Sequence, residues 1–437
     1  MFSAMRYLPA IILLLCHSLC ITAAKKEEIT IVITNPLNSD RLQETVELPL
    51  RDLTARLSTI QGIPVSSASI IITDAEGREI PSQVTSDGKL IFRPAPLKAR
   101  ERRVCHARIS PRKEYGNMVF GRLFPERQED FSFENDRVAY RLYGPETQRK
   151  GEKLYGYDIF NKRTTALFLD ELYADQTDAH MWHTFNRLQA KGMKQEATAL
   201  YMAFCYHIDH GKGMDCYKVG PTLGAGTNAI MSQSRIFYPW CFRQHEILDN
   251  GPLRLSVSLD YGESNIMGIK VSEKRILTLD AGSNMVKAEV CYSIPGQETM
   301  PDGTEVCCGI VIHDENPEAY ILDSDNGIMA YEDLGDVSTA WEGFRDRQAK
   351  EMGRIFIGTY VPAKSLTVEM LPESGIRGVK GHVISRRPFP RDGRFTYFFG
   401  SGWDRNPATA FPTLEQWHAY LTDFSRQQQT PLHVKIR

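Results

Sequence analysis

The chain has 437 residues, and its 52 lysines and arginines against 54 aspartates and glutamates give a formal charge of −2. This balance argues against a basic nucleic-acid-binding protein and against an acidic disordered tail. Hydrophobic residues make up 42% and charged residues 24%, which is typical of a globular protein that buries a core. At roughly 100–200 residues per domain, the length allows two or three domains.

Residues 1–24 have the pattern of a secretory signal peptide. Arg6 precedes an apolar run over 8–16, and small residues lead up to Ala24. The run is too short to span a bilayer, and no later segment approaches the roughly 20 apolar residues that a membrane helix needs. We therefore expect a secreted or periplasmic protein with no membrane span.

The cysteines favour neither a lipid anchor nor a disulfide framework. Leu19 stands before Cys20, where a lipidation signal needs a small residue, so an outer-surface lipoprotein is the less favoured location. Two of the nine cysteines lie in the leader, and the seven that remain are too sparse to staple a fold of this length. The odd number requires at least one free thiol. Cys307 and Cys308 lie in an apolar run and are predicted to be buried thiols.

Residues 25–112 are predicted to form a small antiparallel β-sandwich. The β-branched run 29–34 and the runs 68–73 and 89–92 are typical strands, and turn signals separate them. A hydrophilic stretch over 111–117 then marks a domain boundary.

Residues 113–437 are predicted to form a second, larger β-rich domain, which is the candidate catalytic domain. Asp-Gly and Asn-Gly pairs separate many strand-like runs, and few helical patterns occur. The clearest runs are 253–259, 275–279, 285–294, 306–313, 354–361 and 394–399. A capped helix is predicted from Thr413 to about residue 424, followed by a closing strand. The expected fold is therefore mainly β, with a large antiparallel sandwich of the supersandwich type and a few helices.

Four of the 11 histidines fall within about thirty residues, and we take this cluster as the candidate source of acid–base chemistry. Glycines 211 and 213 make its second half a loop. The alternative is that these side chains are ordinary surface or core histidines. The cluster holds His180, His183, His207 and His210, with Asp209, Asp215, Tyr217 and Lys218 beside it. Its two His-x-x-His spacings would also permit a metal held by His180, His183, His207 or His210, but the spacing alone is a weak signal and we expect no cofactor.

Residues 133–143 are predicted to form one strand with two distinct faces. Asn135, Arg137 and Arg141 fall on one face together with Tyr143. Guanidinium forks match carboxylates, and amides and phenols bind sugar hydroxyls. The face is therefore a candidate binding surface for an acidic sugar; the alternative is an exposed polar face of a sheet.

Three motifs together resemble a secreted bacterial family, that of domain of unknown function 4861. They are FENDRVAYRLYGP at 133–145, HIDHGKGMDCYKVGPTLGAG at 207–226 and GSGWD at 400–404. The resemblance covers most of the mature chain and implies a role in polysaccharide utilisation. It further implies an oligosaccharide dehydratase or lyase acting on uronic acids. Relatives carry an acidic residue near the position of Lys212, so no catalytic role is assigned to that lysine.

β-Elimination from a uronic acid needs a group that neutralises the carboxylate, a base and an acid. We expect His207 or His210 to be the base, and Asp215 to orient a histidine or hold a sugar hydroxyl. The acid would be Tyr206, Tyr217 or Lys218. The substrate-binding candidates are Asn135, Arg137, Arg141, Trp182, His183 and Trp403, with the two tryptophans stacking on sugar faces.

Two other functions remain open from the sequence. One is a glycoside hydrolase with a carboxylate pair drawn from Glu134, Asp136, Asp209 and Asp215. The other is a non-catalytic sugar-binding protein, which would leave the histidine cluster without a role. The elimination hypothesis requires the arginine-bearing strand and the histidine-rich loop to meet.

Overall fold

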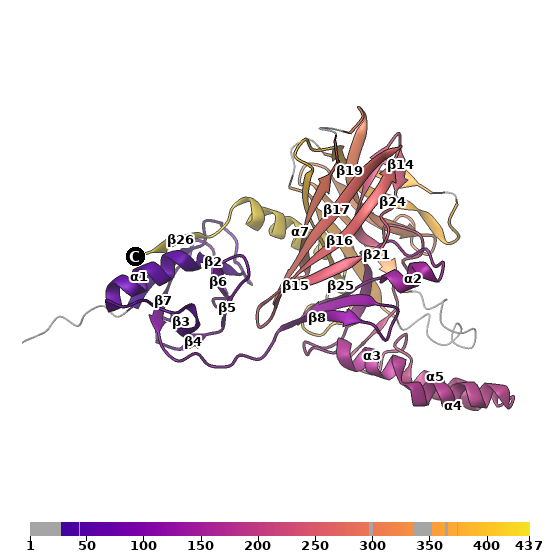
Figure 1. The fold of residues 1–437 in the computed structure, drawn as a ribbon, viewed down its shortest axis with the longest axis horizontal. Helices are drawn as coiled ribbons and strands as arrows, with labels where there is room; N and C mark the ends of the chain where they lie inside the picture. The colour runs from indigo at the N-terminus through magenta and orange to yellow at the C-terminus, as the bar shows by residue number, and fades with distance from the viewer. Residues whose placement is uncertain (1–27, 43, 297–299, 336–351, 363–365, 374) are drawn as a thin grey trace, which may run out of the picture.

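The computed structural model describes residues 28–42, 44–296, 300–335, 352–362, 366–373 and 375–437, so the expected signal peptide lies outside the described residues. The chain forms a small body at its N-terminal end and a larger β-rich body, with helix α7 (Leu414–Gln429) running between them (Figure 1). The described residues contain no helix that is long and apolar enough to cross a membrane.

The small body packs two sheets and one helix around its own core. Alternation along strand β1 (Glu28–Thr34) places Ile29, Ile31 and Ile33 inside. Helix α1 (Leu50–Gln61) was not predicted; it buries Leu53 and Leu57 against the same core. The five-stranded sheet has the order β26(His433–Ile436)–β1(Glu28–Thr34)–β7(Arg102–Ile109)–β3(Ile70–Asp74)–β4(Glu79–Ile80), and the second sheet has the order β2(Val46–Pro49)–β6(Lys89–Phe92)–β5(Ser82–Val84).

The last strand of the chain belongs to this small body. Residues 432–436, which we expect in the large domain, extend away from α7, and β26 pairs antiparallel with β1, Ile436 opposite Ile31. Val434 and Ile436 pack against the small core. A cavity of about 750 Å³ lies between the two bodies.

The large body is a sandwich of one long sheet against two shorter ones, and the predicted mainly β architecture is confirmed. All six strand-like runs named above form strands. The long sheet has the order β15(Gln244–Asn250)–β16(Arg254–Ile266)–β17(Ile269–Asp280)–β18(Met285–Ser293)–β25(Arg394–Trp403)–β22(Arg354–Tyr360)–β21(Ile328–Leu334)–β20(Tyr320–Asp323).

The two shorter sheets are both antiparallel and share a core with the long sheet. A parallel bridge between Tyr157 and Gly224 joins them. The first has the order β14(Arg235–Phe237)–β13(Ala225–Ser232)–β19(Thr304–His313)–β24(Val379–Pro388)–β23(Thr367–Pro372). The second has the order β12(Gly213–Asp215)–β11(Asp158–Lys162)–β10(Ala139–Leu142)–β9(Asp130–Asn135)–β8(Val119–Phe124), and it carries the candidate site.

The predicted single strand over 133–143 is wrong, because the segment is a hairpin. β9 ends at Asn135, whose side-chain oxygen accepts the N–H groups of Arg137 and Val138 and so closes the turn. β10 then runs back antiparallel, with Tyr140 opposite Phe133. The turn breaks the alternation of faces, so Asn135, Arg137 and Arg141 do not share one face.

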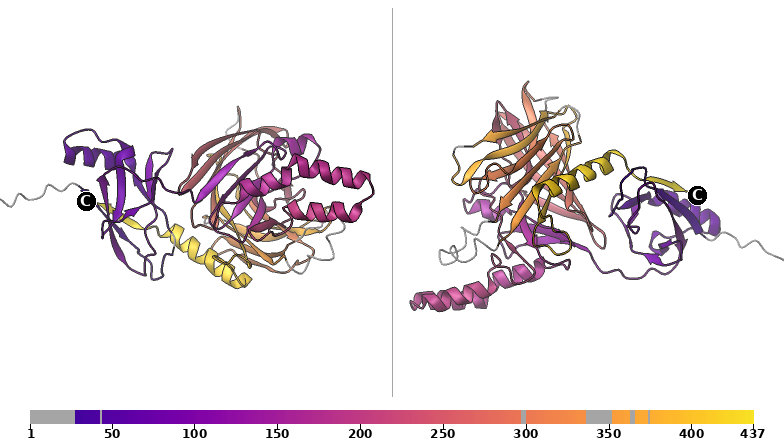
Figure 2. Two further views of the ribbon diagram at one scale, coloured as in Figure 1. Left: turned by 90° about the horizontal axis from the view of Figure 1, so that it is seen from below. Right: turned by 180° about the vertical axis from the view of Figure 1, so that it is seen from behind.

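The helices lie at the margins of the sandwich. The short helix α2 (Pro145–Arg149) follows β10, and α3 (Leu169–Thr177) leads into a hairpin of α4 (Ala179–Ala190) and α5 (Lys194–Phe204) that projects beyond the body (Figures 1 and 2). The predicted C-terminal helix is confirmed as α7, with the Thr413 hydroxyl capping the N–H of Gln416 at 3.3 Å.

The described cysteines are all free thiols, and the predicted burial of Cys307 and Cys308 is confirmed. Of the seven, only Cys291 is exposed. Stability in the described part of the chain therefore rests on packing and hydrogen bonding.

Candidate functional site

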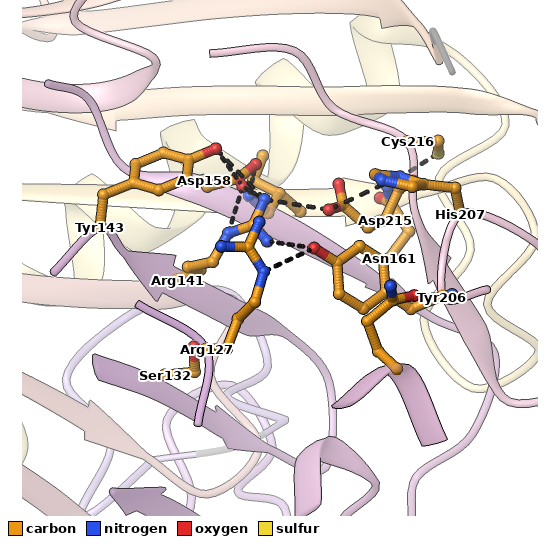
Figure 3. Close-up of polar contacts among 12 residues, drawn as sticks. Arg127, Ser132, Arg141, Tyr143, Asp158, Asn161, Tyr206, His207, Asp215 and Cys216 are labelled. Atoms are coloured by element: carbon orange, nitrogen blue, oxygen red, sulfur yellow. Dashed lines mark hydrogen bonds and ion pairs between the residues drawn. The ribbon is translucent and has the colours of Figure 1, made fainter. Parts of the chain in front are cut away.

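The site is built around Arg141, which is only 4% exposed. Its Nε donates to Oδ2 of Asp158 at 2.7 Å, and a terminal nitrogen donates to Oδ2 of Asp215 at 2.9 Å (Figure 3). The sheet explains the arrangement, because β10, β11 and β12 are neighbours and Arg141 lies opposite Asp158 in register. Asp215 lies opposite Phe160, two residues along from Asp158, and so points to the same face.

Two phenols and a second guanidinium extend this network. The Tyr143 hydroxyl accepts from Arg141 at 3.2 Å and donates to Asp158 at 2.7 Å. The Tyr206 hydroxyl oxygen accepts from Arg141 at 3.2 Å and from Nε of Arg127 at 3.3 Å (Figure 3). Both lone pairs of the Tyr206 oxygen are therefore occupied by cationic donors, and its own O–H remains able to donate.

The buried charges do not balance. Arg127 and Arg141 carry two positive charges, while Asp130, Asp158 and Asp215 are all buried carboxyl groups. Burial raises the pKa of Asp158 to about 7, although Arg141 opposes the shift, and the nearby Asp215 raises it further. Burial likewise raises the pKa of Asp130 to about 6. Such perturbed carboxyl groups in one cluster are typical of functional sites.

His207 joins the network at its accessible edge, with its side chain 18% exposed. Its Nδ1 lies 2.8 Å from the backbone oxygen of Asp215, so Nδ1 carries the hydrogen that is donated to that oxygen. The neutral ring therefore presents an unprotonated Nε2. Oδ2 of Asp215 lies 3.7 Å from Nδ1, and the rings of His207 and Tyr206 are 4.7 Å apart (Figure 3).

Gly213 makes this local geometry possible. Its φ of 136° lies in the region that favours glycine, and a Cβ at this position would lie 2.0 Å from the backbone oxygen of Asn161. Any side chain would therefore force β12 away from β11. The close pairing brings Asp215 beside Arg141. It also lets the backbone N–H of Asp215 donate to the backbone oxygen of Tyr206 at 2.9 Å.

Arg141, Tyr206, His207 and Asp215 are thus brought together, as the elimination hypothesis requires. His210 is not: it is exposed, and its Nε2 bonds to the backbone oxygen of Cys205 at 3.2 Å, away from the network.

The structure places Asn135 and Arg137 elsewhere, because the hairpin turn directs them to the opposite end of β10. The Asn135 amide donates to the backbone oxygens of Asp280 and Ser283, and Arg137 donates to Asn284 at 2.9 Å. Arg137 lines the cavity between the two bodies. Their predicted role in binding a carboxylate together with Arg141 is therefore wrong.

The aromatic and histidine candidates on α4 also lie apart from Arg141. His183 is exposed, while Trp182 packs on Phe204 and donates to the backbone of Gln176 at 2.6 Å, holding the α4–α5 hairpin to its base. Trp403 is 3% exposed and donates to the backbone oxygen of Met352 at 2.8 Å. Trp403 is therefore a buried core residue, and its predicted stacking on a sugar face is wrong. Trp182 is partly exposed, and its stacking on a sugar stays a prediction.

The metal hypothesis finds no assembled ligand set in the described part of the chain, where no three or more His, Cys, Asp or Glu side chains are grouped to hold an ion. The two histidine pairs are separated: His180 and His183 lie on α4, and His207 and His210 follow α5.

The four carboxylates considered for a hydrolase are each engaged by other groups of the protein, and only Asp215 lies in the Arg141 network. Glu134 is fully buried, pairs with Lys162 and accepts the N–H groups that begin α3. Asp136 accepts from the backbone of Gly282, and Asp209 closes the glycine loop and pairs with Arg163. Asp215 is bound to Arg141.

Sequence reasoning missed Arg127 and Asp158 as members of the site. One signal for Asp158 was available: an aspartate between Tyr157 and Ile159, in a run that reads as a buried strand, needs a cationic partner. Arg127 had no such signal, because its approach to Tyr206 depends on how residues 79 positions apart are folded together.

The fold and site define a mainly β protein of two bodies with a buried arginine–carboxylate network. The chain belongs to the family described as Domain of unknown function (DUF4861), which it matches over residues 33–434, and the resemblance stated above is confirmed. It is 24% identical over 428 residues to "Uncharacterized protein P7" of Formosa agariphila, covering 93% of each chain.

Two solved structures are also similar, at 8% identity. One is an alpha-mannosidase from Enterococcus faecalis V583, with a TM-score of 0.45, and the other is a glycosyl hydrolase family 38 protein from Enterococcus faecalis, with a TM-score of 0.43. Each match covers 94% of this chain but only 46% and 48% of those chains, so the protein spans about half of their length. Similarity at this level carries no argument about activity.

Proposed function

We propose that this protein is a carbon–oxygen lyase that acts on uronic-acid-containing oligosaccharides by β-elimination, as a dehydratase or as a polysaccharide lyase. The observation that carries the proposal is the pairing of a histidine with an unprotonated Nε2, His207, and a phenol, Tyr206, whose oxygen is held by Arg127 and Arg141. The signal peptide predicted over 1–24 would place the enzyme outside the cytoplasm, where such polymers occur.

In this reaction the base removes the proton next to the substrate carboxylate. Neutralising the carboxylate makes that proton more acidic. We assign this role to the Tyr206 hydroxyl, which accepts from Arg127 and Arg141 and would donate its own hydrogen to the carboxylate. Tyr206 is 3% exposed, and its ring contacts that of His207. His207 takes the proton on Nε2. Its Nδ1–H stays fixed on the Asp215 backbone, and the Asp215 carboxylate 3.7 Å away stabilises the imidazolium that forms.

The alternatives find less support. A hydrolase needs one carboxyl group that donates a proton and one carboxylate near the glycosidic bond. Asp158 and Asp215 are adjacent, but Oδ2 of each carboxyl group accepts a hydrogen bond from Arg141. A sugar-binding protein would have no use for a histidine whose tautomer is fixed with a free Nε2.

The test is incubation of the purified protein with a panel of uronate-containing oligosaccharides, such as oligogalacturonates, oligoalginates and glucuronate-terminated oligosaccharides. Elimination produces a conjugated double bond that absorbs ultraviolet light. Hydrolysis produces a new reducing end without that absorbance, and a binding protein leaves the mass unchanged. Loss of one water from the product mass would select dehydratase over lyase, and a reducing end without absorbance would refute the proposal.

A further inference from the structure

A second buried polar cluster brings the candidate acid Tyr217 together with residues that the sequence analysis did not select. His313 ends β19, and its Nδ1 lies 3.1 Å from both carboxylate oxygens of Asp333 on β21. The Tyr331 hydroxyl donates to Asp333 at 3.2 Å and accepts the backbone N–H of His313 at 3.1 Å. Because Nδ1 faces a carboxylate, it carries a hydrogen, and the ring is held with Nε2 pointing away from Asp333.

Two polar atoms of this cluster lack a partner. Nε2 of His313 and the hydroxyl of Tyr217 are both buried, and among the described residues neither makes a hydrogen bond. The side chains are 3% and 4% exposed, and their rings lie 6.0 Å apart. An unpaired buried polar atom costs roughly 1–3 kcal/mol, so two on neighbouring rings need a physical explanation.

Tyr217 also connects this cluster to the Arg141 network. Burial raises the pKa of Tyr217 well above its usual range. Asp333 in this cluster and Asp158 in the Arg141 network both raise that pKa further. Tyr217 is therefore a protonated donor at neutral pH. Burial lowers the pKa of His313, but the adjacent Asp333 outweighs this and raises it overall, which favours a protonated Nε2.

We propose, resting on the elimination function above, that Tyr217 is the general acid that protonates the leaving oxygen of the substrate, and that His313 and Asp333 are positioning residues that return a proton to Tyr217. An oxygen seated between the Tyr217 hydroxyl and Nε2 of His313 satisfies both unpartnered atoms. Lys218 follows Tyr217 directly, and the proposal assigns it no proton transfer.

The proposed step is balanced. His207 removes the proton next to the carboxylate, the electrons of that C–H bond form the carbon–carbon double bond, and the bond to the leaving oxygen breaks. That oxygen takes the proton of Tyr217, and Tyr217 recovers one from His313. The proton on His207 returns to solvent, and His313 is reprotonated from solvent, so the enzyme ends as it began.

The test uses the leaving group. A fluoride leaves without being protonated, so a methyl 4-deoxy-4-fluorohexuronoside needs the base but no acid. We expect Tyr217→Phe to lower elimination of an oxygen leaving group by about 10²–10⁴-fold while fluoride release stays within tenfold of the wild type. We expect His313→Gln and Asp333→Asn to show the same selective loss at smaller size, about tenfold to 10²-fold. His207→Ala should lose both reactions.

Tyr292→Phe is the matched control, because Tyr292 is equally buried at 4% but bonds to Asn228, remote from the proposed reaction. It should leave both rates unchanged, and thermal unfolding checks the fold of every variant. Equal loss of oxygen and fluoride elimination in Tyr217→Phe, or no loss of either, would overturn this inference alone. A wild-type protein that makes no unsaturated product would instead overturn the proposed function.

Discussion

Two buried arginines of the large body, Arg141 and Arg275, have different surroundings. Arg275 is 0% exposed, and its Nε pairs with one carboxylate, Glu273, at 2.5 Å. It also donates to the Tyr157 hydroxyl at 2.9 Å and stacks on the ring of Tyr261. Arg141 serves two carboxylates, and its network ends at a half-buried histidine.

The difference indicates that the Arg275 network stabilises the fold, whereas the Arg141 network has the features of a functional site. Around Arg275 one positive charge meets one negative charge, and the other partners are neutral phenols and an amide, so no surplus charge is buried there. One terminal nitrogen of Arg275 makes no hydrogen bond among the described residues. Around Arg141 the carboxyl groups outnumber the guanidinium groups, and burial raises the pKa of two of them, Asp130 and Asp158, toward neutral pH. The four predictions below test this contrast.

The largest effect should come from His207, which lies at the accessible edge of the Arg141 network. We expect His207→Ala to reduce the elimination rate by about 10²–10⁴-fold, because the proton next to the carboxylate loses its acceptor. His210→Ala is the control, since His210 is exposed and its Nε2 hydrogen-bonds to the backbone oxygen of Cys205. Initial rates of ultraviolet absorbance change measure both. Wild-type activity in His207→Ala would remove the proposed base.

Replacing each arginine should distinguish the networks by stability. Arg141→Met leaves Asp158 and Asp215 without their shared partner, so we expect the free energy of unfolding to fall by about 3–5 kcal/mol, together with loss of activity. Arg275→Met strands only Glu273, which still accepts from Asn228 at 2.8 Å, so a smaller loss is expected. Urea unfolding measures both variants. If Arg275→Met lowers the free energy of unfolding more than Arg141→Met does, the surplus negative charge does not lie in the Arg141 network.

The surplus charge should also appear as a pH dependence. The pKa of Asp130 is raised in the folded state to about 6, against about 4 in the unfolded chain. The folded state therefore binds the extra proton, and the stability that it contributes is present below about pH 4 and lost as the pH rises through about 6. We expect Asp130→Asn to gain on the order of 1–2 kcal/mol relative to the wild type between pH 4.5 and pH 7.5.

Urea unfolding at the two pH values gives this difference directly. Asp423→Asn is the control, because Asp423 is exposed and pairs only with Arg426 on α7. A difference between Asp130→Asn and the wild type that does not change with pH would mean that Asp130 holds its usual charge in the folded protein.

The smallest effect on the elimination rate should come from a phenol of the Arg275 network. Tyr157→Phe removes one acceptor from Arg275 and keeps the ring packed on Phe399, so we expect a loss of about 1–3 kcal/mol in stability. The elimination rate should remain within twofold of the wild type, because no step uses this network. A rate loss greater than tenfold in a folded variant would show that the two arginine networks are coupled.

The sequence alone was sufficient for the elements whose signal is local. The strand runs and the helix that Thr413 caps follow from side-chain alternation, turn residues and capping. The family follows from long contiguous motifs. The prediction for residues 133–143 was wrong because the alternation of side chains continues through a turn that the Asn135 side chain closes. A local pattern does not distinguish a long strand from a tight hairpin.

Only the tertiary structure decided which charged residues meet. Arg141, Asp158 and Asp215 are brought together by the order of β10, β11 and β12, and that order depends on Gly213 allowing two backbones to approach. His313 joins Tyr217 from a strand almost a hundred residues away. A buried charge requires a partner, but the sequence does not specify which one, because the partner is chosen by strand pairing and packing across the whole sandwich.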